Sequence, residues 1–347
     1  MLYAGIAWTG QGFDVALLDA QGVTAAPTVR FPAGQVAGLI DHLCALDQRS
    51  GGGLSCVVES TNGMIDGGMM TAGLRVYRAD PWTVPGRPEF GSVDARTLAL
   101  AAAGRLSELT RLVVDSGSLT GRTGELDDCI RQSGRATAAL AGLGRCLAHG
   151  ARDTQDKTIA LTFDDGPNPP HTGRILDVLD RYRVPATFFC VGLHASAHTE
   201  ELARMAEAGH RLGNHTWSHP FLPDLTNREL AVQLERTDEA IATATGGQAP
   251  RLFRPPYGSR TPQILSWLAE QQDGPTVVLW DVEPFDWALP GPEAIARTVL
   301  EQAQPGSIAL MHDGGGDRSQ TAEALPAVIE GLLDRGYRFA LVDELAR

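Results

Sequence analysis

The sequence predicts an α/β protein of two domains, the second of which is a closed or nearly closed barrel of parallel strands. A chain of 347 residues has room for two domains, each large enough to bury its own core. In the C-terminal part, seven apolar runs alternate with segments of helical period, the pattern of repeated strand–helix units. The N-terminal part instead has strand-like runs around an amphipathic helix, which predicts a smaller α/β domain.

The N-terminal elements follow one another in a defined order. The expected order is three strands, a helix over about 35–46, a strand, a helix at a Gly/Met-rich segment and a strand, with the strands at LYAGIAW, FDVALLDA, TVRF, LSCVVES and LRVYRA. Residues 107–149 have a helical period interrupted by SGSLTGRTG, which predicts a helical extension. The polar stretch 149–156 lacks hydrophobic periodicity, so we expect it to link a domain of residues 1–148 to one of residues 157–347.

The C-terminal strands are expected at seven apolar runs, which are TIALTF, ATFFCV, HRLGNH, RLFRPP, TVVLW, SIALMH and YRFALV. In barrels of parallel strands, catalytic side chains lie at or just beyond the C-terminal ends of the strands. The chemically interesting residues of this half occur at those places.

Composition restricts the function. The net charge of −13 and the lack of any Lys/Arg-rich run argue against a protein that binds nucleic acid through its overall field. The five cysteines are odd in number and widely spaced, as expected for reduced thiols in a core. We expect a cytoplasmic protein, because no basic leader precedes an apolar stretch and no run is long enough to span a membrane.

Two motifs indicate a metal site. The strand TIALTF ends in Asp164 and Asp165, and side chains of neighbours at a strand end diverge, so that one acid can bind metal while the other faces substrate. His215 and His219 stand four residues apart, which on a helical turn places both imidazoles on one face. Asp-Asp-Gly-Pro is also a common turn, and a histidine pair at this spacing is often incidental. Their occurrence together favours a metal site.

Three further segments supply the remaining chemistry. Arg254, at the end of RLFRPP, could direct its guanidinium at a carboxylate, or it could be a surface arginine before a turn. The segment WDVEPFDW interleaves acids with aromatic residues, which suit sugar rings or acyl groups but are as common in cores. His312 ends SIALMH and is a candidate general acid, because imidazole titrates near neutrality. A Lewis acid, a base for water and an acid for the leaving group are what a hydrolase of amides or esters needs.

These segments, in this order, resemble the polysaccharide deacetylases, also called NodB-homology domains or carbohydrate esterase family four. The likeness covers about residues 157–345 and includes all five signature segments of the family. It implies a distorted (β/α)7 barrel and a divalent metal, usually zinc and sometimes cobalt or manganese.

The resemblance also implies roles for individual residues. Asp165, His215 and His219 look like the metal ligands and Asp164 like the catalytic base. Arg254 is similar to the arginine that orients this base, and His312 matches the general acid. The backbone N–H of Tyr257 resembles an oxyanion donor, and Trp287 and Leu310 look like walls of the acetyl pocket.

One position departs from the family pattern. Glu283 stands where the family usually has the aspartate that tunes the acidic histidine, so Glu283 is expected to act on His312, with Asp281 as an alternative partner. His312 should still act as the general acid, but the sequence does not determine its pKa.

The N-terminal half more faintly resembles the ribonuclease H-like domain of DEDD-type insertion-sequence transposases, over about residues 3–135. Those enzymes hold two magnesium ions with four acids. Glu59 and Asp94 match two of them, but Ala7 and Gly91 occupy the other positions. Two acids of four leave metal charge uncompensated, so we expect a degenerate domain without nuclease activity that serves as scaffold, dimerisation surface or substrate cap.

The leading hypothesis is a deacetylase that acts on an N- or O-acetyl group of a sugar or sugar-bearing metabolite, with a small molecule or oligosaccharide as substrate and a homodimer through the N-terminal domain as one option. The same metal chemistry on a non-sugar acyl or polyketide-type metabolite, including C–C or amide cleavage, is the alternative. A transposon-derived nucleic-acid binder is the third class, against which the acidic charge argues.

Overall fold

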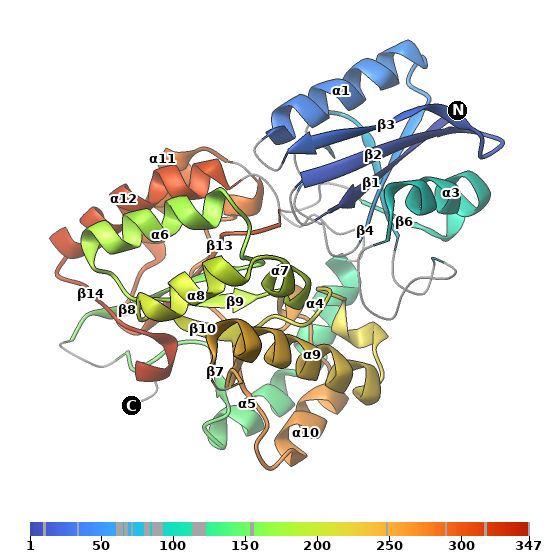
Figure 1. Cartoon of the computed structure of the whole chain (residues 1–347). Helices are drawn as coiled ribbons and strands as arrows, with labels where there is room; N and C mark the ends of the chain where they lie inside the picture. Colours follow the sequence, from blue (N-terminus) through green and yellow to red (C-terminus); the bar gives the residue numbers. More distant parts are fainter. Residues whose placement is uncertain are drawn as a thin grey trace. The chain divides into compact units, whose positions relative to one another are not determined.

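The computed structural model divides the chain into two compact units. The first comprises Met1–Gly124 with Gly315–Asp317, and the second Glu125–Gly314 with Arg318–Arg347 (Figure 1). The structure describes residues 1–9, 12–32, 35–59, 65, 69–70, 72–79, 84, 93–112, 123–152, 156–247, 249–288, 290–315 and 318–345.

A six-stranded sheet forms the centre of the first unit, in the order β3-β2-β1-β4-β5-β6. β1 pairs antiparallel with β2 and parallel with β4, which pairs parallel with β5. The strands are β1 (Leu2–Trp8), β2 (Gly12–Asp19), β3 (Thr24–Pro32), β4 (Leu54–Glu59), β5 (Arg75–Ala79) and β6 (Thr110–Arg111). The predicted strands and their order in this half are therefore confirmed.

Alternating side chains of β1 explain how helices cover both faces of this sheet. Ala4 and Ile6 belong to one hydrophobic cluster with residues of α1 (Val36–Arg49). Tyr3 and Ala7 point the other way, into a cluster with α3 (Ala95–Arg105). α3 lies so close to β1 that a Cβ on Gly5 would be 1.9 Å from the Ala95 carbonyl oxygen.

Of the two acids that matched the transposase pattern, the structure describes the side chain of Asp94. Asp94 caps α3, because its carboxylate accepts hydrogen bonds from the Thr97 N–H (3.0 Å) and hydroxyl (2.6 Å). Ala7 is buried in the sheet, and Gly91 and the Glu59 side chain lie outside the described residues. The ribonuclease H-like assignment and the absence of nuclease activity stay predictions.

A sheet of parallel strands forms the core of the second unit, in the order β13-β8-β9-β10-β11-β12-β7, with β14 also paired to β8. The strands are β7 (Cys146–Leu147), β8 (Thr158–Asp164), β9 (Ala186–Cys190), β10 (Arg211–Asn214), β11 (Leu252–Phe253), β12 (Thr276–Val278), β13 (Ser307–His312) and β14 (Arg338–Phe339). An isolated parallel bridge between Val282 and Ala309 returns the chain after β12 to β13. The sheet thus curls back on itself, and each of the seven apolar runs contains one of its strands.

Helices between successive strands cover the outside of this sheet (Figure 1). The longer ones are α6 (His171–Tyr182), α8 (Thr199–Glu207), α9 (Asn227–Thr245), α10 (Pro262–Glu270), α11 (Pro292–Gln302) and α12 (Ser319–Asp334), and α7 (Gly192–Ala197) is short. Apolar side chains of α6 and α12 pack against Phe163 of β8 and Met311 of β13 in the largest core cluster. This packing fixes the strand ends that carry the candidate site.

The division between the units lies earlier than the sequence predicted. α4 (Thr123–Gln132) and α5 (Gly134–Gly142) precede β7, and β7 is a strand of the second sheet, where Cys146 and Leu147 pair with β12. The helical extension assigned to the first domain therefore belongs mostly to the second unit. A two-residue strand carries no periodicity that would have revealed this.

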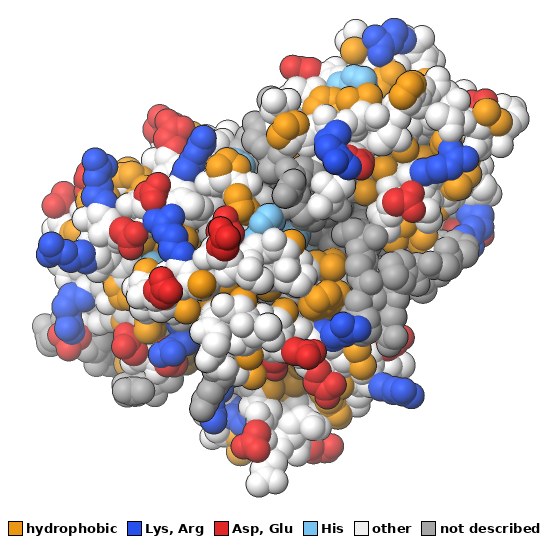
Figure 2. Space-filling view, in the orientation of Figure 1, with side chains coloured by type: hydrophobic (Ala, Val, Ile, Leu, Met, Phe, Trp, Pro, Cys, Tyr) orange, Lys and Arg blue, Asp and Glu red, His pale blue; other side chains and the backbone are white. Residues whose placement is uncertain are grey.

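All five cysteines are free thiols, and four of them are buried, as expected for core residues. Acidic and basic side chains are interspersed over the face shown in Figure 2. Among the described residues, no helix is both long and apolar enough to cross a membrane.

Candidate active site

The candidate metal ligands follow two parallel strands of the second unit. β8 ends at Asp164, and Asp165 turns the chain with a left-handed φ of 74°. β10 ends just before His215, and the loop to His219 contains left-handed residues at Thr216 (φ 68°) and His219 (φ 53°). The prediction that His215 and His219 lie on one helical turn is therefore wrong. The loop is held instead by its own polar groups, as the Thr216 hydroxyl accepts a hydrogen bond from the His219 N–H at 3.0 Å.

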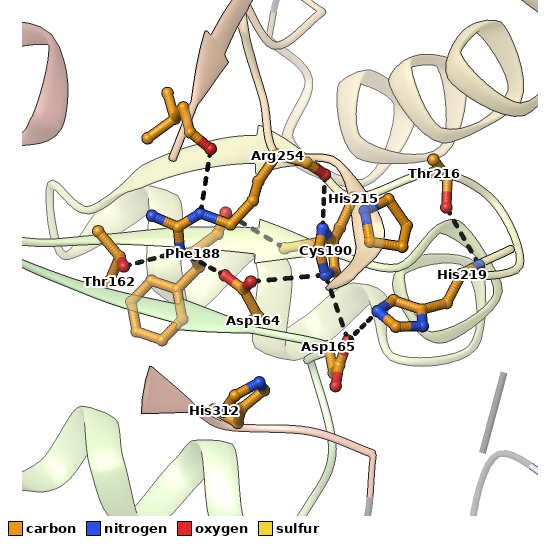
Figure 3. A network of polar contacts seen from close by, with 12 residues as sticks. Thr162, Asp164, Asp165, Phe188, Cys190, His215, Thr216, His219, Arg254 and His312 are labelled. Atoms are coloured by element: carbon orange, nitrogen blue, oxygen red, sulfur yellow. Dashed lines mark hydrogen bonds and ion pairs between the residues drawn. The ribbon is translucent and has the colours of Figure 1, made fainter. Parts of the chain in front are cut away.

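Three side chains converge at this place. Asp165 Oδ1 lies 3.5 Å from Nε2 of His215 and 3.3 Å from Nε2 of His219, and one ligand atom from each residue lies within 4.8 Å of the others (Figure 3). All three side chains are buried. Asp165 Oδ1 accepts no hydrogen bond from the described residues. A buried carboxylate oxygen without a donor fits a divalent cation, for which one carboxylate and two imidazoles are suitable ligands.

The protonation of these groups also suits a cation. Nδ1 of His215 donates to the Arg254 carbonyl at 2.7 Å, which leaves the Nε2 lone pair directed at Asp165. Burial and the neighbouring His219 lower the pKa of His215 to about 3, so its ring is neutral. Burial by itself would raise the pKa of Asp165, but the surrounding histidines lower it overall.

Asp164 is held beside this group by a buried arginine. Arg254 Nη1 donates to Asp164 Oδ1 at 2.7 Å and to the Thr162 hydroxyl at 2.8 Å (Figure 3). The other carboxylate oxygen, Oδ2, lies 3.5 Å from Nε2 of His215 and so faces the metal ligands. Burial raises the pKa of Asp164 to about 6, although Arg254 opposes this rise. Asp164 is thus a fixed carboxylate whose basicity is higher than that of an exposed aspartate.

His312 lies at the end of β13, where it pairs in register with Asp164 of β8. Its Nδ1 is 2.7 Å from Asp286 Oδ1, and its backbone N–H donates to Asp286 Oδ2 at 2.8 Å. Burial opposes protonation of His312, but the Asp286 charge and hydrogen bond raise its pKa overall. The imidazolium is therefore favoured, with Nε2 as the remaining proton donor.

Several known proteins are similar to this part of the chain. Residues 151–274 match the family model of polysaccharide deacetylases. A chitooligosaccharide deacetylase of Rhizobium leguminosarum bv. trifolii is 40% identical over 195 residues, which are 53% of this chain and 89% of that protein. A peptidoglycan-N-acetylglucosamine deacetylase of Bacillus cereus is 37% identical over 192 residues, with 55% and 89% covered.

The chain belongs to the polysaccharide deacetylase family.

Solved structures support the fold of this polysaccharide deacetylase domain. The chain is similar to a crystal structure of a peptidoglycan N-acetylglucosamine deacetylase, with a TM-score of 0.57 at 34% identity over 60% of this chain and 96% of that one. It is also similar to a family-four pseudoenzyme of Bacillus anthracis, with a TM-score of 0.53 at 30% identity over 58% and 69%. A pseudoenzyme of similar fold means that activity must be argued from the site residues themselves.

The expected partner of His312 in this polysaccharide deacetylase is corrected by the structure. Glu283 instead accepts from the indole N–H of Trp280 (3.0 Å) and lies 3.5 Å from that of Trp287. Asp281 binds Arg152 and the Ser307 hydroxyl near the start of β13. Asp286 is the partner, because the chain reverses at Phe285, whose φ of 53° directs the following residue toward His312.

The proposed substrate contacts lie on the elements that carry the site. The Tyr257 ring packs edge-on against that of His219, with centroids 4.5 Å apart, and Tyr257 has a left-handed φ of 60°. Leu310 is buried two residues before His312, on the same face of β13. Trp287 lies in a 3₁₀ helix directly after Asp286. Their roles as oxyanion donor and pocket walls stay proposals.

Two functional neighbours were missed in the sequence. Asp286 could have been found as the third acid of WDVEPFDW, but nothing local favours it over Asp281 or Glu283. His194 of α7 donates from Nδ1 to the Asp165 carbonyl at 2.6 Å, and it is buried with its pKa lowered to about 4 by desolvation. No motif in the sequence marks His194.

Proposed function

We propose that the second unit is a metal-dependent deacetylase that removes an N-acetyl group from an amino sugar of an oligosaccharide. The observation that carries this proposal is the convergence of Asp165, His215 and His219 beside a second, arginine-bound carboxylate, Asp164. The sugar substrate is supported by the named substrates of the relatives from Rhizobium and Bacillus.

The three ligands would hold one divalent cation, for which zinc is our proposal because two imidazoles and one carboxylate are a ligand set found at catalytic zinc sites. When bound, such a cation supplies Lewis acidity toward water and the acetyl carbonyl. His215 is preset for this role, since its Nδ1 is occupied by the Arg254 carbonyl.

Asp164 and His312 would handle the protons. Asp164 accepts a proton from the attacking water, because its carboxylate is fixed by Arg254 and its pKa of about 6 leaves it ionised but basic near neutral pH. His312 donates the proton from Nε2 to the leaving nitrogen, while Asp286 stabilises its cationic form. The products are acetate and the free amine of the sugar.

Substrate recognition is proposed for three residues of the same strand ends. The Tyr257 N–H would bind the oxygen of the acetyl carbonyl as negative charge develops on it. Leu310 and Trp287 would enclose the acetyl methyl group, and the indole N–H of Trp287 lies 3.5 Å from Glu283 Oε1.

Acetate release from an N-acetyl chitooligosaccharide tests the proposal. Removal of metal with a chelator should abolish release, and stoichiometric Zn²⁺ should restore it. His219→Ala should prevent the restoration, whereas His149→Ala should not, because His149 is exposed, lies outside the three ligands and donates from Nδ1 to the Gly150 carbonyl. Full activity of metal-free protein would refute the proposal.

The first unit is proposed to act as a scaffold or dimerisation surface. Light scattering after size-exclusion chromatography separates the options, because a homodimer has twice the chain mass of 36.9 kDa. If the first unit dimerises the protein, a chain without it should elute as a monomer. If the chain without the first unit still has the mass of a dimer, that role is excluded.

A further inference from the structure

A buried acid outside the proposed catalytic machinery lies directly behind the metal ligands. Asp313 follows His312 and has no exposed surface. The pairing of β13 with β8 places it beside the turn formed by Asp164, Asp165 and Gly166. None of the steps proposed above uses Asp313.

The main chain after β13 binds the main chain after β8. The N–H groups of Asp313 and Gly314 both donate to the Asp164 carbonyl, at 3.1 and 3.2 Å. The Asp313 side chain lies directly against Gly166. Its Oδ2 accepts a hydrogen bond from the Thr172 hydroxyl at 2.6 Å. The side chain of Asp313 thus packs against the residue that follows Asp165.

The turn after β8 and the turn after β13 are so close that neither Gly166 nor Gly314 could carry a side chain. A Cβ on Gly166 would lie 1.9 Å from Asp313 Oδ2. A Cβ on Gly314 would lie 2.3 Å from the carbonyl carbon and oxygen of Asp165. Glycine at both positions is therefore required for this close approach, and a shift of the Asp313 carboxylate would be transmitted to the Asp165–Gly166 peptide.

This turn needs outside support, because Asp165 is in the left-handed region, where a residue with a Cβ is strained. Its N–H donates to the Phe189 carbonyl at 3.2 Å, and its own carbonyl accepts from His194 Nδ1 at 2.6 Å. Asp313 packs against the other end of the same peptide at Gly166. The conformation directs the Asp165 carboxylate at His215 and His219 (Figure 3).

We infer that Asp313 is a positioning residue for the metal site: it fixes the Asp165–Gly166 turn and thereby the direction of the Asp165 carboxylate. The inference rests on the metal site of the proposed function and assigns a further residue to it. Asp313 binds neither the cation nor the substrate.

The test is titration of metal-free protein with Co²⁺, followed by its visible absorption and by competition with a chelator. Loss of a group that orients a metal ligand typically weakens metal binding about 10- to 100-fold. Asp313→Ala should weaken Co²⁺ binding by this factor and change the absorption spectrum. Asp313→Asn retains the shape but offers one acceptor oxygen in place of two, so its Co²⁺ affinity should fall about tenfold, at the lower end of that range.

The matched control is Asp281→Asn, which alters a partly buried, hydrogen-bonded acid near the opposite end of β13. It should bind Co²⁺ as the wild type does. If Asp313→Ala does not fold, as judged by circular dichroism, Asp313→Asn decides the question. A folded Asp313 variant with wild-type affinity and spectrum would overturn the inference alone, whereas a wild-type protein that binds no Co²⁺ would overturn the proposed metal site as well.

Discussion

The pair formed by His312 and Asp286 gives the most specific prediction. Replacing Asp286 with asparagine removes the negative charge 2.7 Å from Nδ1 of His312 but keeps an oxygen that can accept its proton. Burial then dominates and lowers the pKa of His312. As the general acid, His312 must be protonated, so activity is lost as pH rises through its pKa. The alkaline limb of the pH–rate profile should therefore move to lower pH in Asp286→Asn.

The size of the shift follows from the interaction that is lost. Opposite charges centred about 4 Å apart interact by about 4 kcal/mol at an effective dielectric constant of about 20. One pKa unit corresponds to about 1.4 kcal/mol, so the limb should move by at most about three units. Shifts by a neighbouring charge are commonly about one to three units. Above the wild-type limb, activity should fall about 10- to 1,000-fold.

The assay is kcat/KM for acetate release as a function of pH in the presence of saturating metal. Glu283→Gln is the matched control, because the sequence pattern assigns the tuning role to Glu283, whereas the structure places Glu283 against Trp280. Thr321→Val removes only the hydroxyl that donates to Asp286 Oδ2 at 2.7 Å and should shift the limb little. A profile that moves in Glu283→Gln and stays in place in Asp286→Asn would refute this reasoning.

Three further substitutions test the surroundings of the site. Asp164→Asn should retain Zn²⁺ binding, measured by calorimetry, but lose at least about 100-fold in kcat, since general base catalysis contributes about 10²–10⁴-fold; near-wild-type turnover would exclude Asp164 as the base. Arg254→Met leaves the Asp164 carboxylate buried without its cation, so the pKa of Asp164 rises and the acidic limb of activity moves to higher pH. Thermal unfolding should show a loss of about 3–5 kcal/mol for the same variant, and an unchanged limb and stability would show that the pair is unimportant. Gly192→Ala would place a Cβ 2.4 Å from the Trp217 ring in the loop between the two histidines, so both stability and Zn²⁺ affinity should fall, and wild-type values would contradict the packing.

The sequence was sufficient to predict the strands and the convergence of the three proposed metal ligands. Apolar runs bounded by turn residues predicted each strand of the second sheet except β7, because buried parallel strands need continuous apolar sequence. The motifs that contain Asp165 and His215 lie at the ends of two such runs, His219 stands four residues after His215, and strand ends of a parallel sheet meet at one edge.

Other features depend on contacts that no local pattern encodes. Asp281, Glu283 and Asp286 lie within six residues, and Asp286, which follows the left-handed backbone at Phe285, is the partner of His312. The loop between His215 and His219 is likewise set by left-handed residues and polar contacts rather than by helical spacing. His194 and Asp313 act on the backbone of Asp165 from other strands and helices, so their positions follow from the tertiary fold alone.

The central claim is that Asp165, His215 and His219 bind one divalent cation. Anomalous diffraction at the zinc edge from a crystal of the protein loaded with Zn²⁺ tests it most directly. The account predicts one strong peak that is contacted by Asp165 Oδ1 and by Nε2 of both histidines. A Zn²⁺-loaded crystal with no peak between these three side chains, or with zinc bound elsewhere in the chain, would contradict it.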